Sequence, residues 1–184
     1  LHGANTLALP SPFPQENLLV LLDGQTSTAY RHRDETLERV ARALWHLASA
    51  RPGHYIAYFP SYRYMEQVRA LCMALYPGLP TLAQRPDMTE AEREEFLRRF
   101  DEDGRTLLGF AVMGGFFGEG VDLTGERLIG AAIVGVGLPQ LCAERELIRR
   151  YHDEQGEDGY GYAYRLPGFL RVMQAAGRVI RSAE

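Results

Sequence analysis

Four residues near the end of the sequence, Gln174, Gly177, Arg178 and Arg181, have the types and spacing of a phosphate-binding surface. In an α-helix, positions i, i+4 and i+7 project together, so Gln174, Arg178 and Arg181 would share one face. Guanidinium groups stay charged at any working pH and match the geometry of phosphate oxygens. Gly177 would cost a helix interior about 1 kcal/mol relative to Ala, which usually signals a close approach to the backbone. The simpler alternative is that these arginines only complement the helix macrodipole.

A second candidate segment, residues 114–122, combines glycines with two carboxylates. Glycines permit positive φ and a close approach of the backbone. Phe116 and Phe117 can anchor this loop in the core, which would leave Glu119 and Asp122 to project polar groups at fixed positions. These carboxylates could orient arginines or a bound water, or accept a hydrogen bond from a ribose hydroxyl. The alternative is a tight turn whose carboxylates are solvated.

A third candidate, Ser61, Tyr62 and Arg63, lies where a predicted strand leads into a predicted helix. The free N–H groups and the dipole at a helix N-terminus favour an anion such as a nucleic-acid phosphate. Tyr62 could stack on a base or sugar, and Arg63 could pair with a phosphate. From this segment alone, a well-capped helix with ordinary surface side chains is the favoured interpretation.

Alternating strands and helices position these segments. Residues 1–16 read as an extended lead-in, and short apolar runs predict strands, the first of them buried on both faces. This alternation predicts parallel βαβ units and an open α/β sheet with helices on both faces. Such sheets place functional loops beyond the carboxyl ends of strands, here after Phe59, Val112 and Val136. Strands are predicted at 17–22, 54–59, 81–84, 106–112 and 128–136, and helices at 34–50, after the cap Ser61, at 91–100, at 141–155 and from Pro167 to Arg181.

Composition limits the classes of function. The 184 residues suffice for one domain with a substantial core, and the net charge of -4 gives no general basic field. The sequence contains no lysine, so a phosphate loop ending in Gly-Lys-Ser/Thr cannot lie in it. Cys72 and Cys142 stand far apart, which predicts buried free thiols in a reducing cytosol. No apolar run is long enough to cross a membrane, so we expect a cytoplasmic protein without a membrane partner.

In order and spacing, these segments resemble motifs IV, V and VI of the XPD/DinG group of superfamily 2 DNA helicases. The matching stretches are Phe59–Tyr62, 118–123 (Gly-Glu-Gly-Val-Asp-Leu) and 174–181 (Gln-Ala-Ala-Gly-Arg-Val-Ile-Arg). The resemblance extends from about Ser11 to the last residue. Phe117 and Gly118 stand where relatives often have Trp or Ser.

The resemblance implies the second of two motor domains: a RecA-like, three-layer α/β/α domain with an open, mainly parallel sheet, of the P-loop NTPase-like helicase C-terminal type. We expect residues 1–16 to be a linker and residues 17–184 to form this domain, truncated after motif VI. The start at Leu1 and the end just after the arginine segment suggest a piece of a longer protein. ATP and Mg²⁺ would be shared with a first motor domain of the same parent chain, and an iron–sulfur cluster would belong to that absent part.

The resemblance also implies residue roles. Arg178 and Arg181 would be catalytic, as arginines that reach the ATP phosphates, and no metal ligand is assigned in this chain. The other expected contacts are, on the nucleotide side, Gln174, Gly177, Glu119, Gly120 and Asp122, and, on single-stranded DNA, Ser61, Tyr62 and Arg63.

The primary hypothesis is therefore a motor domain that couples ATP hydrolysis to 5′–3′ translocation and DNA unwinding, with a role in DNA repair. Alone, it would be inactive as an ATPase. The rival hypothesis is a RecA-like module that binds nucleic acid or a partner in a parent that no longer hydrolyses ATP. A parent that also carries a nuclease domain is a third alternative.

Overall fold

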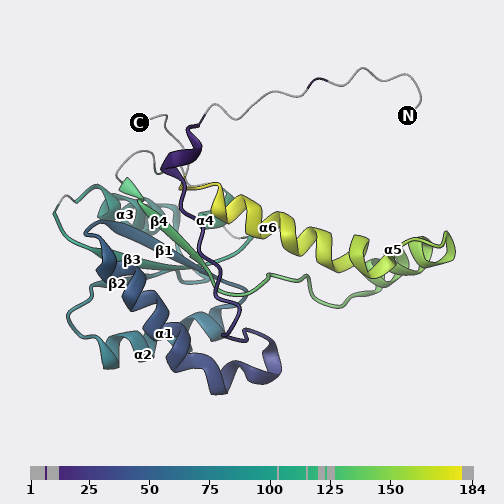
Figure 1. Cartoon of the computed structure of the whole chain (residues 1–184), viewed down its shortest axis with the longest axis horizontal. Helices are drawn as coiled ribbons and strands as arrows, with labels where there is room; N and C mark the ends of the chain where they lie inside the picture. Colours follow the sequence, from purple (N-terminus) through teal and green to yellow (C-terminus); the bar gives the residue numbers. More distant parts are fainter. Residues whose placement is uncertain are drawn as a thin grey trace.

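The computed structural model describes residues 7, 13–102, 104–114, 116–119, 123 and 127–179. Its centre is one parallel sheet in the order β2-β3-β1-β4 (Figure 1). The strands are β1 (His54–Phe59), β2 (Thr81–Ala83), β3 (Leu107–Val112) and β4 (Gly130–Ile133). Every strand pairing in this sheet is parallel, so the predicted α/β fold class is confirmed.

Helices cover both faces of the sheet. Figure 1 shows α1 and α2 on one side and α3, α4 and α6 on the other, while α5 lies away from the sheet. The helices are α1 (Arg33–Ala50), α2 (Tyr62–Leu75), α3 (Glu90–Arg98), α4 (Phe116–Glu119), α5 (Ala143–Glu154) and α6 (Leu166–Ala176), with short 3₁₀ segments at Gln15–Asn17, Tyr30–His32 and Arg99–Asp101 and a π-helical segment at Gly161–Arg165.

The two-residue period of β1 divides the core into two layers. Tyr55, Ala57 and Phe59 face the apolar cluster formed with α1 and α2. Ile56 and Tyr58 face the opposite cluster, which contains residues from α3, α4 and α6. All six residues of β1 are buried, which explains why this strand reads as a continuous apolar run rather than as an alternating one.

Predicted helix starts agree with the structure. The Ser61 side chain accepts a hydrogen bond from the backbone N–H of Tyr64 and caps α2. Thr89 and Glu92 form a capping box at the start of α3, where each side chain accepts a hydrogen bond from the other residue's backbone N–H. Local hydrogen bonding of this kind depends on neighbours in sequence, so spacing alone suffices to predict it.

The predicted strand at residues 17–22 is wrong. Residues 18–22 lie outside any helix or strand and are exposed, with Leu22 at 92% exposure. A strand must pair with a neighbour, and the described sheet ends at β2 and β4 without taking up this segment. Directly after this segment, the Asp23 carboxylate accepts hydrogen bonds from the Gln25 backbone N–H and the Thr26 hydroxyl. These bonds stabilise a local turn and not the hydrogen-bond ladder of a strand.

The predicted strand at 128–136 is shorter in the structure, because β4 covers only Gly130–Ile133. Gly135 has φ +82°, a left-handed conformation that ends the extended backbone just after the strand. Leu128 and Val134 are buried, whereas β4 itself is half-buried at the edge of the described sheet.

The two thiols differ. Cys72 is buried on α2, and burial raises its pKa to about 11, so it stays protonated at neutral pH. Cys142 is exposed, which corrects the prediction that both thiols are buried. It precedes α5, a helix with no buried residue.

Helix α5 and the π-helical segment form an arm beyond the sheet (Figure 1). Arg149 pairs with Glu146 at 3.1 Å, and Arg145 donates to the Ala163 carbonyl oxygen at 2.8 Å. The arginines of α5 thus take part in local ion pairs and hydrogen bonds on a helix that buries no residue. Among the described residues, no helix is both long and apolar enough to cross a membrane.

Candidate nucleotide and nucleic-acid site

The carboxyl ends of the strands bring the predicted segments to one edge of the sheet. Phe59 pairs with Val112, and Tyr58 pairs with Ile133, so β1, β3 and β4 end side by side. The loops after Phe59, Val112 and Val136 therefore begin at the same edge, as the alternation of strands and helices predicts.

The first segment at this edge is the start of α2. Ser61 is the N-cap, Tyr62 is half-buried and Arg63 is exposed. Arg63 has no ion pair within the part of the chain that the structure describes. The helix N-terminus thus presents a hydroxyl, a phenol and a guanidinium together, which is the set expected for an anion such as a phosphate.

Tyr62 feels the charges of two side chains and forms a hydrogen bond with a buried amide. Burial raises the pKa of Tyr62, the positive charge of Arg93 opposes this rise, and the charge of Asp87 adds to it. The Gln84 side-chain amide donates to the Tyr62 hydroxyl at 2.8 Å. Arg93 also lies over the Phe116 ring, with its guanidinium carbon 4.9 Å from the ring centre. A cation from α3 is therefore held close to the start of α2.

The glycine-rich segment continues from β3. Gly114 has φ +73°, a conformation that favours glycine, and Phe117 is fully buried in the apolar cluster that contains Ile56 and Tyr58. The buried Tyr58 hydroxyl donates to the Phe117 carbonyl oxygen at 3.1 Å. Phe117 also packs against Phe96, with ring centres 4.3 Å apart. The prediction that a phenylalanine anchors this loop in the core is confirmed for Phe117.

The acidic end of this segment is less fully described. Glu119 is the last residue of α4, and its side chain lies outside the described atoms. Gly120 and Asp122 lie outside the described residues. The roles predicted for these three residues stay predictions.

Arg178 lies near the buried phenol at this edge. Burial raises the pKa of Tyr58 to about 12, and the positive charge of Arg178 opposes the rise. Arg178 is half-buried. Two neighbours hold this part of the chain in place, because Ala175 is buried in the apolar cluster that contains Tyr58 and Val179 packs against that cluster. Ala175 and Val179 thereby keep Arg178 next to the apolar cluster that contains Tyr58 of β1 and Phe117 of α4.

The predicted single helix through Arg181 needs correction. Helix α6 ends at Ala176, and Gly177 is its C-cap with φ -67°. The backbone N–H of Arg178 donates to the Ala175 carbonyl oxygen, an i to i−3 bond typical of a tightened last helical turn. Gly177 therefore lies at the end of the helix, where its low helix propensity helps to terminate it. Gln174 is exposed in the last turn, and Arg181 lies outside the described residues.

Arg171 was not singled out from the sequence, yet it joins two loops at this edge. Its guanidinium donates to the Gly137 carbonyl oxygen at 3.0 Å, beyond β4. A Cβ atom added at Gly114, beyond β3, would lie 3.3 Å from Arg171 Nε. Arg171 is therefore a contact between α6 and the glycine-rich segment. Its spacing three residues before Gln174, one helical turn away, is the only signal for it in the sequence.

Gly114→Ala tests this contact. The left-handed φ costs a non-glycine residue roughly 1–2 kcal/mol, and the new methyl group would also push on Arg171. Gly104 is the matched control, because it has φ +83° with nothing within 4 Å of its would-be Cβ. In urea denaturation, we expect Gly114→Ala to lower the free energy of unfolding more than Gly104→Ala does. Equal losses would contradict the contact.

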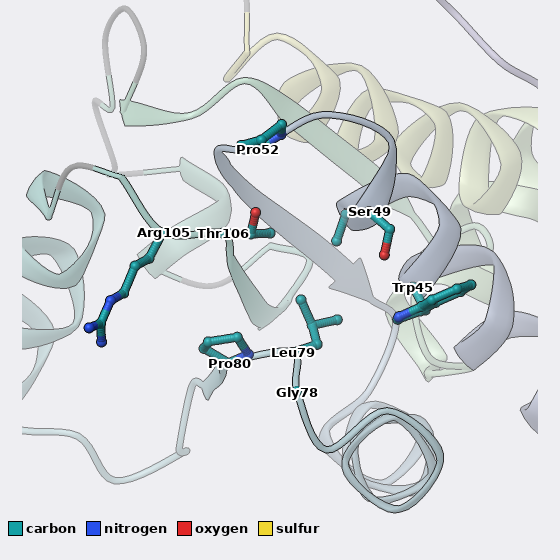
Figure 2. Close-up of a pocket in the computed structure, with 9 residues that line it drawn as sticks. Trp45, Ser49, Pro52, Gly78, Leu79, Pro80, Arg105 and Thr106 are labelled. Atoms are coloured by element: carbon teal, nitrogen blue, oxygen red, sulfur yellow. The ribbon is translucent and has the colours of Figure 1, made fainter.

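A separate hollow lies at the opposite edge, near the amino ends of the strands (Figure 2). It has a volume of about 500 Å³ and contains none of the predicted site residues. Its lining comprises Trp45, Ala48, Ser49, Pro52, Gly78, Leu79, Pro80, Arg105 and Thr106. In the described residues, no group of three or more His, Cys, Asp or Glu side chains could hold a metal ion.

A parallel α/β domain with arginine and glycine-rich segments at the carboxyl edge of its sheet has the architecture of a helicase motor domain. Comparison with known sequences agrees: the profile of the helicase C-terminal domain family matches residues 44–184. The chain belongs to this family, and the resemblance drawn from its motifs is confirmed.

A curated relative is a probable ATP-dependent helicase of Methanocaldococcus jannaschii, 28% identical over 200 residues. The alignment covers 99% of this chain but 29% of the relative. Two solved structures share the fold. An apo XPD structure superposes with a TM-score of 0.67 at 20% identity, over 86% of this chain and 32% of its own. The structure of Xpd4 from S. tokodaii superposes with a TM-score of 0.62 at 18% identity, over 87% of this chain and 30% of its own. The chain thus spans about a third or less of each.

Proposed function

We propose that this domain is the second motor domain of an ATP-dependent DNA helicase. Arg178 and Arg181 would contact the β- and γ-phosphates of ATP bound between this domain and a first motor domain, and would stabilise the charge that develops in phosphoryl transfer. The observation that supports this most is the packing on both sides of Arg178: Ala175 and Val179 belong to the same apolar cluster as Tyr58, on the strand that ends beside β3.

The described donors at this edge suit a triphosphate. A phosphate oxygen only accepts hydrogen bonds at neutral pH, and the Arg178 guanidinium and the Gln174 amide supply N–H donors. Gln174 is exposed in the last turn of α6, one turn before Arg178. Mg²⁺, when bound, neutralises charge on the phosphates, and we assign its main ligands to the first motor domain.

The start of α2 would hold single-stranded DNA. Ser61, Tyr62 and Arg63 lie at a helix N-terminus next to the strand that carries Tyr58. DNA contacts here and phosphate contacts at Arg178 would thus share β1 as a rigid support. Closure of the two motor domains on ATP, and their opening after hydrolysis, would then move the strand by one step, in the 5′–3′ direction implied by the family resemblance.

The test is ATP hydrolysis by the full-length protein with and without single-stranded DNA, followed by unwinding of duplexes with a 5′ or a 3′ tail. We expect DNA to accelerate hydrolysis and only the 5′-tailed duplex to unwind. If DNA does not stimulate hydrolysis, the motor function is wrong and the RecA-like binding module takes its place. Unwinding of the 3′-tailed duplex alone would keep the motor and overturn its direction.

A further inference from the structure

Gln84 is a buried polar side chain, with 6% exposure, at the carboxyl end of β2. The end of β2 belongs to none of the three helicase motifs and is not among the loops predicted to be functional, which follow Phe59, Val112 and Val136. The Gln84 side chain makes two hydrogen bonds to residues distant in sequence. Its amide nitrogen bonds the Tyr62 hydroxyl, and its amide oxygen bonds the backbone N–H of Val112 at 2.9 Å.

The bond to Val112 completes the ladder between β2 and β3. Along β3, the N–H of Leu108 donates to the Pro80 carbonyl oxygen, and the Gln84 N–H donates to the Phe110 carbonyl oxygen. Continuing this alternation, the N–H of Val112 points toward β2 just where that strand ends. The Gln84 side chain supplies the acceptor that a longer β2 would have supplied.

This bond also fixes which way the amide faces. A backbone N–H can only donate, so the atom next to Val112 must be the amide oxygen, and the NH₂ group must face Tyr62. An amide NH₂ can only donate, so Tyr62 accepts this bond through its oxygen. The hydroxyl hydrogen of Tyr62 is then left to donate elsewhere, and no acceptor for it is found within the part of the chain that the structure describes.

We propose that Gln84 is a positioning residue that sets the Tyr62 hydroxyl as a hydrogen-bond donor toward a phosphate oxygen of single-stranded DNA. This inference rests on the proposed function, because that function supplies the DNA. A phosphate oxygen accepts and cannot donate, so a tyrosine whose hydrogen is kept free fits it, whereas one whose hydrogen is already taken does not. Gln84 thereby also links the DNA contact to the strand that leads into the glycine-rich segment.

Gln84→Glu separates this role from a merely structural one. A carboxylate still accepts from the N–H of Val112, so the ladder is kept. It cannot donate to Tyr62, and instead accepts the Tyr62 hydrogen and removes it from the DNA. We expect Gln84→Glu and Tyr62→Phe each to weaken single-stranded DNA binding by the full-length protein about 10-fold or more, the value of a hydrogen bond to a charged group.

The double variant distinguishes this mechanism from repulsion by the added charge. If Gln84→Glu acts through the Tyr62 hydroxyl, it should change affinity by less than about 2-fold in a Tyr62→Phe background. Gln155→Glu, an exposed change just after α5, controls for net charge and should bind as wild type. Affinities are measured by fluorescence anisotropy with a labelled oligonucleotide, after thermal melting has shown that each variant is folded.

Three results would overturn the proposal. Gln84→Glu could bind DNA as the wild type does, or its loss could persist in the Tyr62→Phe background. Third, failure of the wild type to bind single-stranded DNA would overturn this inference together with the proposed DNA contact. If DNA stimulates hydrolysis by the wild type but the variants keep wild-type DNA affinity, this inference alone is overturned. If Gln84→Glu does not fold, Gln84→Met replaces it in both backgrounds. Met supplies neither the donor to Tyr62 nor a good acceptor for Val112, so we expect a larger loss where Tyr62 is present than in the Tyr62→Phe background, and equal losses would overturn the proposal.

Discussion

Replacing Arg178 or Arg181 with alanine in the full-length protein should reduce DNA-stimulated ATP hydrolysis by about 10³- to 10⁵-fold, the range measured for arginine fingers in phosphoryl transfer. The physical reason is that a guanidinium stabilises charge that develops on the phosphates in the transition state, which no neutral side chain replaces. The measurement is kcat at saturating ATP and DNA. Arg178→Lys keeps the charge but loses the planar fork, so an intermediate loss is expected.

Arg42→Ala is the matched control for these variants. Arg42 is exposed on α1, where it pairs with Glu38 at 2.7 Å, and α1 packs on the face of the sheet opposite to α6. Its loss should leave kcat unchanged, because an exposed ion pair contributes little. DNA affinity should be retained in all variants. If only one of Arg178→Ala and Arg181→Ala loses turnover, that arginine alone is the finger, and if neither does, the assignment is wrong.

The sequence was sufficient for features that depend on near neighbours. The cap of α2 at Ser61 and the capping box of Thr89 and Glu92 are bonds across three residues, and spacing reveals them directly. Strand β1 follows from its aromatic and β-branched residues between Pro52-Gly53 and Pro60. Parallel pairing then follows from the alternation of strands and helices.

Residues 17–22 show where this reasoning stops. An apolar run indicates which residues favour burial but does not identify the surface that would bury them. In the structure, the segment is exposed and pairs with no strand among the described residues. Gly177 is a related case. The spacing of Gln174, Arg178 and Arg181 predicts a helix with Gly177 in its interior. The helix instead ends at Ala176, because a residue of low helix propensity is also a natural end point.

The contacts that organise the candidate site cross long stretches of sequence, and this explains why sequence patterns missed them. Gln84 reaches Tyr62 across 22 residues and Val112 across 28, and Tyr58 reaches Phe117 across 59. No periodicity records such a pair. The one available signal was position, since Gln84 ends a predicted strand of a parallel sheet, where functional residues gather.

Phe117→Ala should lower the free energy of unfolding by about 3–5 kcal/mol, the usual loss for truncating a fully buried phenylalanine. Phe117 has 0% exposure and contacts Phe96 at a ring-centre distance of 4.3 Å, so its removal leaves a cavity in the core layer on the α3 and α6 side of the sheet. The measurement is urea denaturation at neutral pH, with m compared between variants to confirm that the change is one of stability.

Phe116→Ala is the control, because it removes the same side chain from the neighbouring position. Phe116 is only half-buried and lies under the Arg93 guanidinium, so we expect a loss of about 1 kcal/mol. Equal losses at the two positions would contradict the anchoring of the loop by Phe117. Because the Phe117 carbonyl oxygen also accepts the Tyr58 hydrogen bond, the cavity would loosen the loop beside Arg178. In the full-length protein, Phe117→Ala should therefore lower DNA-stimulated hydrolysis even at temperatures where the domain stays folded, whereas Phe116→Ala should not.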